Sequence, residues 1–138
     1  PSMEGWLHTS YDPALVSRES ETSSIIYMKI HTPTFLVAER DLVLRQEINR
    51  IGPDYAYIQL IAAPEAKDLM DDYIRIDGFS GRWDFEKISG EQVKVTYEGM
   101  VDPGGYFPAA VANLMVTETP YETLRKLNEH IKMIYGVN

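Results

Sequence analysis

The sequence predicts an α+β domain in which an antiparallel β-sheet is followed by one long helical segment. Up to a turn at 102–105, apolar residues largely alternate with polar ones, as expected of strands with one buried face. After that turn, apolar residues recur every three or four positions, as on one face of a helix. No glycine-, serine- or proline-rich linker divides the 138 residues, so a single domain over 1–138 is expected.

The strands are expected to follow one another along the chain. A weak edge-strand candidate comes first, and the clearest alternating segments follow it, at 14–20, 24–32, 40–49, 54–63 and 93–99. Within 73–88 the alternation changes parity, because Ile76 lies on one side and Phe79 on the other. This change predicts a bulge or kink at Gly78 or Gly81. The result is an antiparallel meander of about six strands.

The helical segment is expected to begin at Tyr106, and its apolar residues cover more of its circumference than packing on one sheet requires. The residues from Thr119 to Glu122 match a capping box with proline at the first helical position. This motif predicts either a second helix that starts at Pro120 or one long helix kinked near Thr119. The excess apolar surface has two explanations: a dry core, or a cavity for an apolar ligand between sheet and helix.

The composition of the chain limits which partners it could bind and which catalytic or metal sites it could hold. A net charge of −8 and a pI near 4.8 disfavour contact with phosphate backbones, so no nucleic-acid partner is expected. Without cysteine there are neither disulfides nor thiolate sites. His8, His31 and His130 lack the spacing of a metal motif, so no metal, cofactor or catalytic residue is assigned. No apolar run is long enough to cross a bilayer; a soluble protein is expected, with cytoplasm and periplasm both open.

Three motifs, taken in order, resemble one family. "RDLVL" at 40–44 is similar to the strand opening of the StAR-related lipid-transfer (START) domains, and "FSGRWDF" at 79–85 is similar to a later strand. "VDPGGYFPAAVANLMVTETPYETLRKL" at 101–127 resembles the turn and closing helix of that family. The resemblance extends over residues from about 24 to 130.

The resemblance implies the helix-grip fold of the Bet v 1-like superfamily. In that fold a curved antiparallel sheet wraps around a long C-terminal α-helix, with a hydrophobic cavity between them. It further implies a non-enzymatic protein that binds, and in some members transfers, a lipid or other hydrophobic small molecule. The alternative is a cyclase or aromatase-type enzyme of the same superfamily that uses the same cavity, and a third hypothesis is an interaction module with a vestigial cavity.

The inner parity of the strands and the sheet-facing stripe of the helix predict the ligand-binding wall of this cavity. Its residues are Leu42, Leu44, Gln46, Ile58, Leu60, Val111, Leu114 and Met115. Gln46 is expected to act as a polar anchor, because an amide can bind a hydroxyl, carbonyl or ester. Sterol-carrying members have an arginine at the matching position, so the resemblance does not extend to a sterol ligand.

Two further expectations concern the surroundings of the cavity. Phe35, Leu36 and Val37 are three consecutive apolar residues in a connection between strands, and they are predicted to form a lid that contacts a membrane transiently. The first strand and early helices of the family precede the matched region and are expected to be missing from this chain. If they are missing, an open sheet edge allows a dimer.

Overall fold

The computed structural model describes residues 9–136, apart from the side chain of Leu114. One long helix, α1 (Ala109–Tyr135), follows the strands, and a short 3₁₀ helix, η1 (Pro64–Ala66), lies between two of them. The strands are β1 (Ser10–Arg18), β2 (Ser23–Ile30), β3 (Arg40–Arg50), β4 (Tyr55–Ala62), β5 (Ile74–Ile76), β6 (Gly78–Lys87) and β7 (Val93–Asp102).

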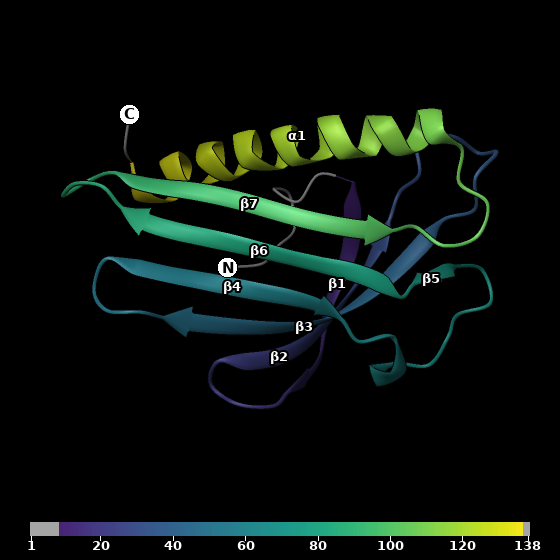
Figure 1. Cartoon of the computed structure of the whole chain (residues 1–138), viewed down its shortest axis with the longest axis horizontal. Helices are drawn as coiled ribbons and strands as arrows, with labels where there is room; N and C mark the ends of the chain where they lie inside the picture. Colours follow the sequence, from purple (N-terminus) through teal and green to yellow (C-terminus); the bar gives the residue numbers. More distant parts are fainter. Residues whose placement is uncertain (1–8, 137–138) are drawn as a thin grey trace.

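These strands form one curved sheet, which α1 crosses on one side (Figure 1). Its main path runs β1-β2-β3-β4-β6-β7, and each neighbouring pair on this path is antiparallel. The short strand β5 lies off the path and pairs in parallel with the start of β3. The predicted α+β class, with an antiparallel sheet and a long C-terminal helix, is confirmed.

The segment 73–88 forms two strands instead of one bulged strand. β5 ends at Ile76 and β6 begins at Gly78, so the change of parity falls on Asp77 between them. The chain changes strand partners at this point, because β5 pairs with β3 and β6 pairs with β4. The break near Gly78 was therefore placed correctly, whereas Gly81 lies inside an uninterrupted strand.

The helix is continuous, so the alternative of a second helix starting at Pro120 is wrong. It begins at Ala109 after Pro108, slightly later than the predicted start at Tyr106, and Pro120 lies inside it. The residues on both sides of Pro120 face the same sheet, and this tertiary packing overrides the local capping signal. Gly136, in the left-handed conformation, ends the helix. Among the described residues, no helix is long and apolar enough to cross a bilayer.

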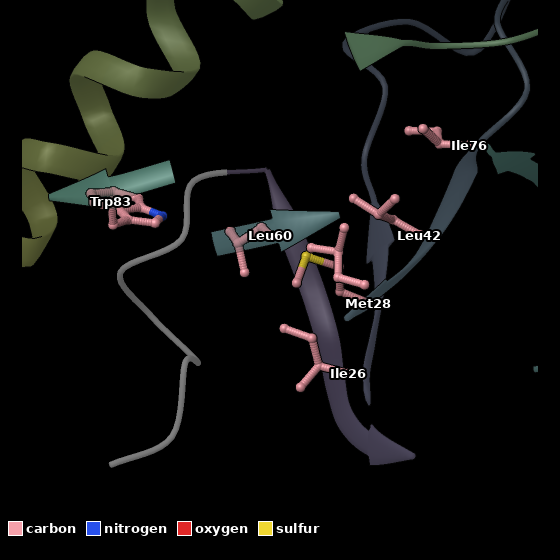
Figure 2. Packing of buried hydrophobic residues seen from close by; sticks show 7 residues of the cluster. Ile26, Met28, Leu42, Leu60, Ile76 and Trp83 are labelled. Atoms are coloured by element: carbon pink, nitrogen blue, oxygen red, sulfur yellow. The ribbon is translucent and has the colours of Figure 1, made fainter. Parts of the chain in front are cut away.

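Hydrophobic residues pack on both faces of the sheet. The inner cluster joins strands β2 to β6, and Figure 2 shows its side chains converging from these strands; the labelled members are Ile26, Met28, Leu42, Leu60, Ile76 and Trp83. Leu124 and Leu127 of α1 pack against this cluster. A smaller cluster on the outer face contains Tyr27 and Val43, with Ala66 of η1 packed against it. The inner face is therefore the one that α1 covers.

Candidate functional site

A cavity of about 470 Å³ lies between the inner face of the sheet and α1. This volume falls in the range of about 300–1,000 Å³ that is common for small-molecule pockets. Apolar side chains from six of the seven strands, β2 to β7, and from α1 form most of the wall. The cavity therefore occupies the place that a dry core would fill.

Most of the residues predicted for the cavity wall lie at this cavity. Those that line it are Leu42, Leu44, Gln46, Ile58, Leu60 and Met115. Val111 is half-buried in the first turns of α1 but lies outside the lining formed by the described residues. The side chain of Leu114 is outside the described part of the structure.

Two groups of lining residues were not part of the predicted ligand-binding wall. On α1, small and polar side chains face the cavity beside Met115, including Ala112, Thr119 and Thr123. On β6 and β7 an aromatic wall is formed by Phe79, Trp83, Phe85 and Tyr97. The sequence did contain a signal for the second group, because Phe79, Trp83 and Phe85 share one parity on β6.

Arg40 anchors the segment that links β7 to α1. It is 1% exposed, and its guanidinium donates hydrogen bonds to the carbonyls of Pro103 (3.2 Å), Gly104 (3.0 Å) and Tyr106 (3.1 Å). It also donates to the carbonyl of Ala38. Burial lowers the pKa of Arg40 from its ordinary value. The arginine thus joins two loops at one end of the cavity, which it also lines.

Asp41 makes a second anchor on the outer face of the sheet. Its carboxylate accepts two hydrogen bonds from Arg75, at 2.7 and 2.8 Å, and both side chains are almost fully buried. Arg75 also donates to the carbonyls of Pro64, Lys67 and Asp68. The hydrogen bond to Asp41 raises the pKa of Arg75. Arg75, held by Asp41 of β3, thus fastens the 63–73 segment, which covers the outer cluster, to the sheet.

The 31–39 loop, between β2 and β3, contains the predicted lid residues. Phe35 and Leu36 are 96% and 76% exposed, whereas Val37 is buried at 4%. The Thr32 hydroxyl donates to the Val37 carbonyl at 2.9 Å, and Arg40 donates to the carbonyl of Ala38 in the same loop. Val37 therefore fastens the loop to the domain, and only Phe35 and Leu36 present apolar surface at its tip.

Gln46 brings a polar group into the apolar wall. It is half-buried on β3, opposite Leu60 of β4. Within the described part of the chain, no side chain or backbone group forms a hydrogen bond with the side-chain amide of Gln46. The amide is therefore available to a ligand or to water in the cavity. No group of three or more histidine, cysteine, aspartate or glutamate residues that could hold a metal ion occurs among the described residues.

The curved sheet, the long C-terminal helix and the apolar cavity between them form a helix-grip fold like that of START domains. No family profile matches the chain. A protein of Pseudomonas aeruginosa, itself uncharacterised, is 27% identical over 122 residues, or 88% of this chain. The chain spans 59% of the length of that relative.

Solved structures confirm the resemblance to START domains. A STAR-related lipid transfer protein fragment from Xanthomonas axonopodis is 28% identical, with a TM-score of 0.81, and the match covers 92% of this chain and 70% of that one. Human STARD10 (15% identity, TM-score 0.74) is matched over 93% of this chain and 54% of its own. Human StAR-related lipid transfer protein 5 (12% identity, TM-score 0.81) is matched over 95% and 64%. At these identities the two human proteins show the fold alone.

Proposed function

We propose that this chain binds a lipid or other hydrophobic small molecule in the cavity between the sheet and α1. The observation that carries the proposal is the cavity itself, about 470 Å³ of space lined mainly by apolar side chains where a dry core would otherwise lie. The similarity to a STAR-related lipid transfer protein supports a lipid as the ligand class. About ten methylenes buried at about 0.8 kcal/mol each would supply roughly 8 kcal/mol, which corresponds to about micromolar affinity before the cost of ordering the ligand is subtracted.

The proposed activity is binding without covalent chemistry. The ionisable side chains in the described lining are Arg40 and Tyr97. Backbone carbonyls already accept the hydrogen bonds of Arg40, and burial raises the pKa of Tyr97, which keeps it protonated at neutral pH. General acid–base chemistry uses groups that titrate near the working pH. The lining therefore suits a binding protein better than the cyclase or aromatase alternative.

Replacing Met115 with tryptophan tests the ligand-binding wall, which we assign to Leu42, Leu44, Gln46, Ile58, Leu60 and Met115. Met115 lines the cavity from α1 and is half-buried, so a larger side chain there should occupy ligand space. Affinity for Nile red, a neutral dye whose emission shifts in apolar surroundings, should fall about tenfold or more. Fluorescence titration measures the affinity, and thermal unfolding shows that the variant is folded.

Met133→Trp is the matched control, because Met133 lies on the same helix but is 74% exposed and outside the described lining. Its affinity for Nile red should equal that of the unmodified protein. If Met115→Trp bound the dye as well as Met133→Trp does, the cavity would not be the binding site.

The tip of the 31–39 loop is proposed to contact membranes while a ligand is exchanged. The exposed side chains of Phe35 and Leu36 lie on a loop that Arg40 joins to the start of the α1 segment, at one end of the cavity. With a net charge of −8, contact should depend on apolar insertion and not on attraction to anionic lipid.

Phe35→Asp should lower association with phosphatidylcholine vesicles about tenfold, because one aromatic side chain no longer inserts. Co-flotation with the vesicles measures this, and Nile red affinity in solution should stay unchanged. Leu69→Asp is the control, since Leu69 is similarly exposed at 75% but lies in the 63–73 segment on the other face of the sheet. An equal loss of vesicle binding in both variants would contradict a specific role for the loop.

A further inference from the structure

Two glycines face each other on the cavity side of β6 and β7. Gly81 and Gly99 are directly paired, and they lie in the same cross-strand row as Gln46 on β3 and Leu60 on β4. A Cβ atom added at Gly99 would lie 2.5 Å from the hydroxyl oxygen of Tyr97. Glycine is therefore needed at this position for the tyrosine to keep its place.

The aromatic rings next to these glycines lie along the sheet and do not stand into the cavity. A Cβ atom at Gly81 would lie 3.1 Å from the Phe79 ring and 3.5 Å from the Tyr97 ring. Tyr97 also packs against Trp83, with the ring centroids 4.5 Å apart. The ring of Tyr97 is thus in contact with Trp83 and lies close to the glycine pair, and its hydroxyl lies over Gly99 in the wall of the cavity.

The Tyr97 hydroxyl has unused hydrogen-bonding capacity. None of the described residues forms a hydrogen bond with this hydroxyl. The hydroxyl oxygen is also not fully buried, because every fully buried polar side-chain atom of the described residues has a hydrogen-bond partner. Burial raises the pKa of Tyr97, so at neutral pH the phenol is protonated and can both donate and accept a hydrogen bond. Thr32 and Arg40, polar neighbours in the same lining, already donate to backbone carbonyls.

We propose that Tyr97 is a specificity-determining residue whose hydroxyl binds a neutral oxygen atom of the ligand, in a hydroxyl, ketone or ester group. This inference rests on the proposed function and narrows its ligand class. A pure hydrocarbon in the cavity would cover the hydroxyl without giving it a partner, which is unfavourable. A carboxylate would require a cation, and the guanidinium of Arg40 is already bound to the carbonyls of Pro103, Gly104 and Tyr106. Gly99 acts as a positioning residue for the hydroxyl.

The test compares dodecanol with tridecane, two probes of matched size that differ in one oxygen atom. Both are measured by displacement of Nile red from the whole chain. Tyr97→Phe should weaken dodecanol binding about 3- to 10-fold without weakening tridecane binding, because only the alcohol loses a hydrogen bond. Tyr121→Phe is the control, since Tyr121 is on α1, 67% exposed and outside the described lining, and it should alter neither affinity.

Gly99→Ala provides a second variant that keeps the hydroxyl but displaces it. It should reduce the ratio of dodecanol to tridecane affinity in the same direction as Tyr97→Phe. The two changes should not add in the double variant, because both remove the same contact. If either substitution acted only by disturbing the structure, it would lower the affinities for dodecanol and tridecane equally.

The possible outcomes distinguish a failure of this inference from a failure of the proposed function. Equal losses for both probes, or no loss for dodecanol, would overturn the role of Tyr97 while leaving cavity binding intact. Laurate that bound more tightly than dodecanol, and did so equally well in Tyr97→Phe, would overturn the neutral ligand class. If neither dodecanol nor tridecane displaced Nile red from the unmodified protein, the proposed function would fail and this inference with it.

Discussion

Replacing Asp41 with alanine should lower the free energy of unfolding by about 3–5 kcal/mol, because it leaves a buried arginine without its counter-ion. Asp41 and Arg75 are 1% and 5% exposed at their side chains, and the bidentate contact is short, at 2.7 and 2.8 Å. The guanidinium would still be held by the carbonyls of Pro64, Lys67 and Asp68, but its charge would be uncompensated. A domain of this size has about 5–15 kcal/mol of total stability, so the loss is a large fraction.

Urea unfolding followed by circular dichroism measures the change, and the melting temperature should fall by about 10 °C or more. Glu19→Ala is the control, because Glu19, in the turn between β1 and β2, pairs with Arg45 of β3 at the surface, where an ion pair contributes little. If Asp41→Ala were as stable as Glu19→Ala, the 63–73 segment would not depend on the buried pair.

Arg40→Met should cost about 2–4 kcal/mol of stability, because the carbonyls that Arg40 serves lose their donor. Methionine keeps an apolar stem of similar length, so the loss is one of hydrogen bonds more than of packing. The substitution also frees the 31–39 loop from the segment between β7 and α1, since Arg40 donates to both. The end of the cavity should then open more readily, and Nile red should dissociate about tenfold faster.

Stopped-flow fluorescence measures this dissociation rate, and chemical unfolding measures the stability. Arg45→Met is the matched control: Arg45 is on the same strand, but its side chain is 39% exposed and pairs with Glu19 at the surface. It should change neither quantity appreciably. An Arg40→Met protein that kept the original stability and dissociation rate would show that the two loops hold together without the arginine.

The sheet could be predicted because each strand buries one face. Period-two alternation in 24–32 and 40–49 placed Ile26, Leu42 and Leu44 on the inner face, where the inner cluster contains them. The pairing of β5 with β3 could not be predicted in this way, because a strand of three residues carries almost no periodicity. The position of β5 depends on which strand has an unpaired edge beside it, and this is determined only by the arrangement of the folded sheet.

The helix face was harder to predict, because hydrophobicity was the guide to which residues of the helix face the sheet. Tyr121 is 67% exposed, whereas the smaller and more polar Thr119 and Thr123 line the cavity. A helix that covers a cavity must leave space beneath it, so small side chains face the cavity. Hydrophobicity alone therefore does not identify which residues of α1 line the cavity. The same reasoning explains why Val111 was assigned to the wall and Ala112 was not.

The roles of Arg40 and Asp41 were also beyond the reach of sequence patterns. The two residues are adjacent on β3, so their side chains leave opposite faces of the sheet, and each fastens a different loop. Their partners are backbone carbonyls and an arginine far along the chain, none of which a local motif reveals. The resemblance to START domains identified the pair, but the structure supplies the reason why both residues are charged.

The central claim is that the cavity holds a hydrophobic ligand, and mass spectrometry of an organic extract from gently purified protein tests it most directly. The unmodified protein and Met133→Trp should each release a neutral, oxygen-bearing apolar molecule in near-stoichiometric amount. Met115→Trp, with its cavity filled, should release much less of the same molecule. Extracts that contained no apolar molecule, or the same amount from all three proteins, would contradict the claim.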